Sequence, residues 1–99
     1  MTANEVLSEF QNWYNAQCNG EWENNHGIDI DTLDNPGWIV QIDIEGTSHE
    51  KVDFSEVHDV DSEVDWMHCR VRDERFEIAC SALRLEEGLR VFLDWVRDG

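Results

Sequence analysis

Basic residues are scarce in this sequence, and the first half of the chain has none. The 99 residues include 23 Asp and Glu but only 7 Lys and Arg, which gives a formal net charge of −16. No Lys or Arg precedes Lys51, and the other six bases lie between Arg70 and Arg97. Nucleic acids and anionic membranes would repel such a chain, so we expect neither as a partner. The acidity serves either solubility or attraction to a basic partner.

Long apolar runs are lacking too, and cysteine is sparse. Residues Met1–Glu5 show neither the basic nor the apolar region of a signal peptide, and no later run is long enough to span a membrane. Cys18, Cys69 and Cys80 are odd in number and form no C-x-x-C pair, which favours reduced thiols over a disulfide framework. We therefore predict a cytoplasmic protein whose cysteines act as small hydrophobic residues.

The usual constellations for catalysis and metal binding are missing. The six glycines are scattered singly, so the sequence has no phosphate-binding loop. No nucleophile signature surrounds any cysteine, and the acidic stretch from Asp29 to Gly37 lacks the glycine that an EF-hand loop needs at its sixth position. We predict no enzymatic activity, no cofactor and no metal site. A carboxylate or thiol site of unrecognised type is the remaining enzymatic alternative.

Helical spacing of apolar residues marks both ends of the chain. Thr2 and Glu5 match the pattern of a capping box, and apolar residues recur at helical spacing until Gly20. Near the other end, Ser81 can cap a second helix whose apolar stripe runs from Leu85 to Val96. The sequence therefore predicts one helix at each end.

Period-two alternation between these helices predicts strands. The predicted segments are a polar connection at 21–25, a strand at 28–31, a turn at 34–37, a central strand at 38–45, a short strand at 52–54, a loop or ragged edge at 58–63, and a hairpin of 66–72 with 76–80 around Asp73-Glu74. The strand connections are too short for parallel crossovers. We predict a single α+β domain over residues 1–99, with a mostly antiparallel sheet of about five strands and both helices on one sheet face.

Five tryptophans could be core residues or interface anchors. Trp13 and Trp38 follow apolar periodicities, so we expect them to be buried. Trp22 lies between two glutamates, and Trp66 falls on the less apolar face of its strand. Both could therefore be exposed or buried, as could Trp95, which lies off the stripe of its helix.

Four segments in the first half resemble the immunity protein 53 family. They are Asn12-Trp13-Tyr14, Gln17-Cys18-Asn19-Gly20-Glu21-Trp22-Glu23, Gly27-Ile28 and Thr32-Leu33-Asp34-Asn35-Pro36-Gly37-Trp38. The resemblance continues through the strand at 40–44, more loosely through Asp65-Trp66 and Cys69, and into the leucine-rich last helix. It implies a small cytoplasmic protein of a bacterial polymorphic toxin system. Such a protein binds a cognate toxin domain and protects the producing cell or its kin.

The candidate contact residues are acids and two tryptophans. We expect a basic toxin surface, such as the substrate groove of a nuclease, to be covered by the acids, with exposed tryptophans as apolar anchors. The candidate partner-binding residues are Glu21, Trp22, Glu23, Asp29, Asp31, Asp34, Asp43, Glu45 and Trp66. The alternative function is an acidic nucleic-acid mimic that binds DNA- or RNA-binding proteins in general. An immunity protein should have one partner, whereas a mimic should have several, and the oligomeric state stays open.

Overall fold

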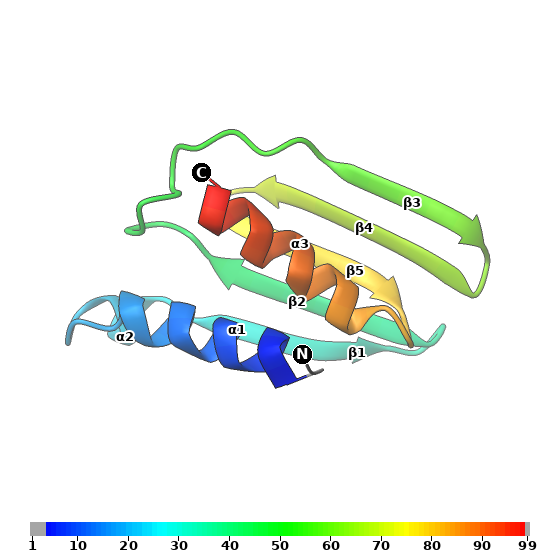
Figure 1. Cartoon of the computed structure of the whole chain (residues 1–99), viewed down its shortest axis with the longest axis horizontal. Helices are drawn as coiled ribbons and strands as arrows, with labels where there is room; N and C mark the ends of the chain where they lie inside the picture. Colours follow the sequence, from blue (N-terminus) through cyan, green and yellow to red (C-terminus); the bar gives the residue numbers. More distant parts are fainter. Residues whose placement is uncertain (1–3, 99) are drawn as a thin grey trace.

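The computed structural model describes residues 4–98 and places two long helices on one face of a five-stranded sheet (Figure 1). The elements are α1 (Asn4–Gln17), α2 (Trp22–Asn25), β1 (Ile28–Leu33), β2 (Gly37–Asp43), β3 (Val57–Ser62), β4 (Asp65–Arg72), β5 (Arg75–Ser81) and α3 (Leu85–Asp98). The predicted cap Thr2 lies outside the described residues. Within residues 4–98, no helix combines the length and the apolar character that crossing a membrane requires.

The sheet is antiparallel throughout, with the strand order β1-β2-β5-β4-β3. Residues 44–56 lead from the end of β2 around the end of the sheet to β3 on the far edge (Figure 1). Helices α1 and α3 lie side by side over one sheet face, and no helix within residues 4–98 covers the other (Figure 1). This confirms the predicted α+β fold. The strands lie between the two long helices in the sequence, and both helices pack on one face of the sheet.

The core lies between this helix layer and the sheet. Alternate residues of β2 and β5 face the helices, as the period of a strand requires. Val40, Ile42, Phe76, Ile78 and Cys80 are fully buried there, whereas Trp38, like Trp13 of α1, is only partly buried and packs against the core. Phe92 of α3 lies at the centre of this layer and is itself fully buried. Its ring centroid is 6.1 Å from that of Phe10, 4.9 Å from that of Trp13 and 5.0 Å from that of Phe76. These edge-on contacts join α1, α3 and the central strand β5.

One prediction about the middle of the chain is wrong. Residues 52–54 form no strand, because Phe54 belongs to the 44–56 connection and packs on the core instead. Its ring centroid lies 4.7 Å from that of Phe76 and 5.5 Å from that of Trp95. The polar stretch predicted as a loop or ragged edge forms most of β3, an edge strand whose register shifts between Val60 and Ser62, so the ragged-edge alternative is the correct one. It is polar because β3 is an edge strand, which leaves one side of its backbone open to water.

Ser81 does not cap α3, and this prediction is also wrong. The Ser81 hydroxyl accepts a hydrogen bond from the Trp66 backbone N–H at 3.1 Å and donates one to the Trp66 carbonyl oxygen at 3.2 Å. The side chain therefore extends the pairing of β4 with β5, and α3 begins four residues later at Leu85. The polar connection predicted at 21–25 contains the short helix α2.

The three cysteines differ in accessibility, which predicts their reactivity. Cys69 and Cys80 are buried, whereas Cys18 is partly exposed. Burial raises the pKa of the Cys69 thiol to about 12 and also raises that of Cys80, so both stay protonated at neutral pH. We expect a chromogenic disulfide reagent to modify Cys18 rapidly and the other two only after unfolding in urea. Rapid modification of all three thiols in the native protein would contradict this packing.

Candidate interaction surface

The sheet face opposite the helices, called the open face below, carries the second set of alternating strand residues. Successive side chains of a strand point to opposite faces, so the strand register decides which residues share this face. They include Asp29 and Asp31 of β1, Ile39, Gln41 and Asp43 of β2, Arg75, Glu77 and Ala79 of β5, Trp66, His68 and Arg70 of β4, and His58 and Val60 of β3. The acidic edge at β1 and the region around Trp66, His68 and His58 at β4 and β3 therefore lie on opposite sides of the open face, with β2 and β5 between them.

Cross-strand ion pairs occupy the middle of the open face. The Arg75 Nε donates to Asp43 Oδ1 at 2.9 Å, and the Arg70 Nε donates to Glu77 Oε1 at 2.8 Å. Gln41 lies between the pairs, donating to Glu77 at 3.0 Å and accepting from Arg75 at 3.3 Å. Asp43, a predicted partner-binding acid, is therefore already paired within the sheet. Its other carboxylate oxygen accepts the Gly27 backbone N–H at 2.8 Å.

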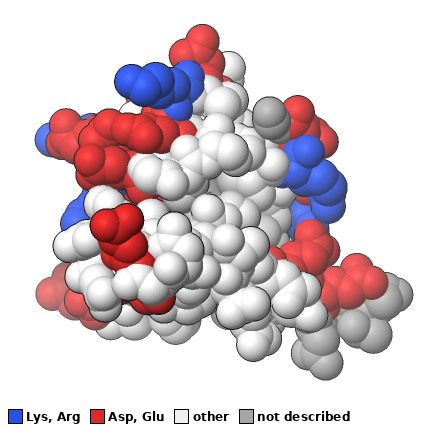
Figure 2. All heavy atoms as spheres, turned by 90° about the vertical axis from the view of Figure 1, so that its left-hand side faces the viewer, with Lys and Arg blue, Asp and Glu red and all other residues white. Residues whose placement is uncertain are grey.

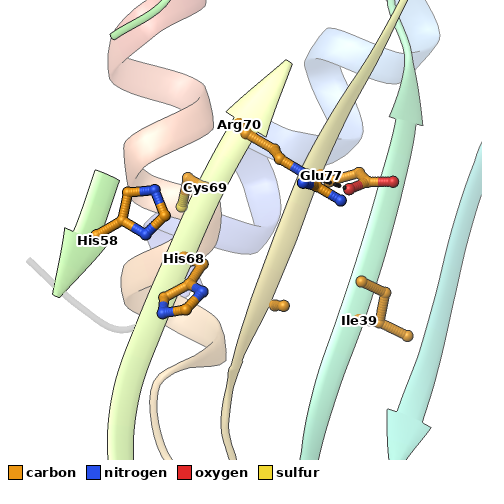
Figure 3. Close-up of a pocket in the computed structure, with 7 residues that line it drawn as sticks. Ile39, His58, His68, Cys69, Arg70 and Glu77 are labelled. Atoms are coloured by element: carbon orange, nitrogen blue, oxygen red, sulfur yellow. Dashed lines mark hydrogen bonds and ion pairs between the residues drawn. The ribbon is translucent and has the colours of Figure 1, made fainter. Parts of the chain in front are cut away.

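A shallow depression of about 210 Å³ lies beside these pairs (Figure 3). His58 of β3 and His68 of β4 stand together at one side with ring centroids 4.8 Å apart, and Arg70 and Glu77 form its polar side (Figure 3). Ile39 and Ala79 add apolar atoms. Cys69 also borders the depression, but its side chain is buried on the helix side of β4. The depression thus offers mixed apolar and polar contact area for another molecule.

Five of the predicted acids are exposed, namely Glu21, Asp29, Asp31, Asp34 and Glu45. Within residues 4–98, none of these five carboxylates lies within ion-pairing distance of a Lys, Arg or His. Four of them follow one long side of the molecule, from the residue before α2 along β1 to the β1–β2 turn (Figure 1). These four, Glu21, Asp29, Asp31 and Asp34, are called the acidic side below.

The fifth acid, Glu45, belongs to a different cluster at the end of β2. One carboxylate oxygen from each of Glu45, Glu50 and Glu74 lies within 4.8 Å of the others. A hydrogen bond with Glu50 and repulsion from Glu45 raise the pKa of Glu74. Three such oxygens could share a cation. However, these carboxylates are accessible to solvent, and in a chain with 23 Asp and Glu some carboxylates lie close together by chance.

Figure 2, which faces the end of the molecule on the left of Figure 1, shows acidic residues around an uncharged central area.

Glu77 links the open face to a testable pH dependence. Burial raises the pKa of Glu77, but hydrogen bonds from Arg70 and Gln41 outweigh burial and leave the pKa below its ordinary value of 4.5. The charged Glu77 side chain therefore stabilises the folded protein fully at pH values above its pKa in the unfolded chain. This stabilisation is lost as the pH falls through the pKa of Glu77 in the folded protein. We expect Glu77→Gln to cost at most about 1 kcal/mol at pH 7, because Arg70 is half exposed, and to cost less at pH 3. Urea unfolding at both pH values measures the difference, and a cost that is equal at both would contradict the assignment.

Comparison with known proteins places the chain in a family. The family model for immunity protein 53 matches residues 7–97, nearly the whole chain. The chain belongs to the immunity protein 53 family. No curated protein and no solved structure matches it. The expected family is thus confirmed.

In this immunity protein 53 chain, the motif Asn19-Gly20-Glu21-Trp22-Glu23 builds a turn that satisfies its own hydrogen bonds. The Asn19 side-chain oxygen accepts the backbone N–H groups of Glu21 and Trp22, both at 2.9 Å. The Glu23 carboxylate accepts those of Asn19 at 2.9 Å and Gly20 at 2.7 Å. A hydrogen bond from its own backbone N–H, together with these two, lowers the pKa of Glu23. Glu23, predicted as a contact residue, therefore holds the turn into α2. Gly20 supplies the positive φ of 92° that the turn needs.

The two tryptophans proposed as anchors have different environments. Trp22 is only 5% exposed, so the alternative that it is an exposed anchor is wrong. Its indole packs edge-on against Trp13 and Tyr14, and its N–H donates to the Glu45 carbonyl oxygen at 2.9 Å. A tryptophan between two glutamates can thus be buried when its N–H finds a partner. Trp66 is partly exposed on the open face, with its ring centroid 5.6 Å from that of His68.

Proposed function

We propose that this chain neutralises a cognate toxin domain of a bacterial polymorphic toxin system by covering a basic surface of that toxin. Membership of the immunity protein 53 family supports the role. The observation that carries the mechanism is the acidic side, where Glu21, Asp29, Asp31 and Asp34 are exposed and have no cationic partner within residues 4–98. Elsewhere in the fold, Asp43 and Glu77 are paired with arginines. The acidic side therefore keeps its carboxylates available for a partner.

Charge and apolar contact contribute differently to such a complex. Unpaired carboxylates on a chain of charge −16 accelerate encounter with a basic surface, and salt screens this effect. Slow dissociation needs apolar anchors that become fully desolvated. The open face supplies Trp66, Ile39 and the 60% exposed Val60 for that purpose. The acidic side sets the association rate, and the open face around Trp66 sets the dissociation rate.

Charge reversal on the acidic side, compared with the same charge change at other exposed positions, tests the steering. The variant Glu21→Lys/Asp31→Lys/Asp34→Lys changes the acidic side, and Asp61→Lys/Glu63→Lys/Glu86→Lys makes the same charge change at exposed positions away from it. With the toxin domain encoded next to this chain, the first variant should associate at least about tenfold more slowly at low salt, and the second within about threefold of the unchanged protein. Steering by the acidic side would be ruled out if both variants lost association rate equally, or if the association rate did not change with salt concentration.

Trp66→Ala tests the anchor separately. The substitution removes apolar area from the open face but leaves the backbone bonds between Trp66 and Ser81 in place. We expect dissociation to become about tenfold faster or more, with association little changed, because anchors act mainly on the dissociation rate. Leu83→Ala, which removes a 97% exposed side chain next to α3, is the matched control. Dissociation that is the same for both variants would exclude Trp66 from the interface.

A further inference from the structure

We propose that the outer edge of β1 accepts an extended segment of the toxin as a sixth strand, with alternating apolar and Lys or Arg side chains. This inference rests on the proposed function and names the contact through which the acidic side acts. An edge strand presents unpaired backbone groups that can pair with another chain. Within residues 4–98, β1 and β3 are the two edges of the sheet.

The two edges differ in regularity. Strand β1 pairs with β2 over six consecutive residues without interruption. The register of β3 with β4 shifts between Val60 and Ser62, an irregularity of the kind that turns an edge away from new partners. In addition, Asp59 of β3 is held by Arg84 at 2.7 Å. The regular edge, β1, is therefore the better template for an added strand.

The register identifies the backbone groups that face outward. The Asp43 N–H donates to the Gly27 carbonyl oxygen at 3.0 Å, so this opposed pair is hydrogen-bonded. Hydrogen-bonded and non-bonded pairs alternate along an antiparallel ladder. The backbone groups of Asp29 and Asp31 therefore point to β2, and those of Ile28 and Ile30 point away from the sheet. The outward N–H of the next such residue, Thr32, is already bonded to the Asp31 side chain at 2.8 Å.

The helix side of this edge is apolar. A groove of about 450 Å³ runs between α1 and β1, and its lining includes Phe10, Tyr14, Ile28 and Ile30. Tyr14 is 40% exposed and Ile30 is 49% exposed, so the groove presents apolar area to solvent. An added strand would place every second side chain over this groove. Apolar side chains at those positions would bury its exposed area.

The opposite side of the same edge is acidic. Asp29 and Asp31 point to the open face, opposite Gln41 and Ile39 of β2. The remaining side chains of an added strand would lie beside these two carboxylates, where Lys or Arg fits and an acid does not. This requirement disfavours a second copy of the chain, because β1 paired antiparallel with itself would place Asp29 against Asp31. The occupant is therefore a basic, alternating segment of another protein.

Hydrogen exchange in the complex tests the pairing directly. The probe is the toxin domain encoded next to this chain, mixed with the full chain at saturating concentration. We expect the Ile28 and Ile30 amides to exchange at least about tenfold more slowly in the complex, while residues 57–62 of β3 stay unchanged. A complex without this protection would overturn the β1 inference and leave the proposed function intact. No complex at all would overturn both, and protection that grows with concentration of the chain alone would assign the edge to a second copy.

Two substitutions at one position separate backbone pairing from groove contact. Ile30→Ala and Ile30→Pro both remove the apolar side chain, but only proline also removes the outward N–H. Proline is tolerated on an edge strand when its missing N–H faces solvent. We expect Ile30→Pro to bind the toxin at least about tenfold more weakly than Ile30→Ala. Equal affinities would exclude strand addition, and if Ile30→Pro fails to fold, the exchange experiment on the unchanged chain decides.

Discussion

Replacing Phe92 by alanine is expected to lower the free energy of unfolding by about 3–5 kcal/mol, the largest loss from a single side chain in this fold. Phe92 is fully buried and its ring contacts those of Phe10, Trp13 and Phe76. Alanine would leave a cavity where α1, α3 and β5 meet, and three rigid aromatic rings cannot close it. For a domain of this size, such a loss is a large part of the total stability.

Urea unfolding of Phe92→Ala measures this effect, with Leu83→Ala as the control. Both changes remove a large apolar side chain near or within α3, but Leu83 is 97% exposed and should cost less than about 0.5 kcal/mol. Similar costs for the two variants would contradict the placement of Phe92 at the centre of the core.

Gly37→Ala is expected to be the second most damaging change, at about 3 kcal/mol. A methyl group added at Gly37 would clash with the backbone carbonyl oxygen of Cys80. Gly37 opens β2 and pairs with Ser81 of β5, so relief of this clash requires the two central strands to move apart. A clash with backbone cannot be relieved by a change of rotamer, which places the cost at the upper end of the range for overpacking.

Gly27→Ala is the matched control, because an added methyl group there meets no atom within 4 Å. Gly27→Ala should change the free energy of unfolding by no more than about 1 kcal/mol and should not destabilise, because it reduces only the backbone freedom of the unfolded chain. Thermal or urea unfolding of both variants gives the comparison. If both alanine variants are equally stable, the backbone of β5 does not approach Gly37 closely enough to exclude a methyl group.

Local patterns predicted most of the fold because each acts over a few residues. The β4–β5 hairpin follows from two alternating stretches around Asp73-Glu74, and both turn residues adopt positive φ, 55° and 61°. The central strand β2 follows from its alternation. Strand β3 was predicted only as a loop or ragged edge, because residues 58–63 are polar and show no clear period-two alternation. The pairing of β2 with β5 joins residues about 40 apart, and no local pattern encodes it.

The candidate site was only partly predictable, because burial and pairing depend on distant residues. Nothing near Trp22 in the sequence shows that the Glu45 carbonyl oxygen will accept its N–H. Likewise, Asp43 is an alternating strand acid like Asp31, but Arg75 pairs with it across 32 positions. The acids along β1 are available because β1 lies at the edge of the sheet, which is a property of topology. The sequence therefore predicted an acidic protein but not which acids remain unpaired.

Co-expression of this chain with any toxin domain that its neighbouring gene encodes tests the central claim most directly. Cell survival is scored first, and the pair is then purified together and its stoichiometry measured. The proposed function predicts survival with a stoichiometric complex, and no retention of unrelated basic proteins. Cell death without a complex, when the chain is shown to be folded, would contradict cognate immunity. Retention of several unrelated basic proteins would instead favour a general nucleic-acid mimic.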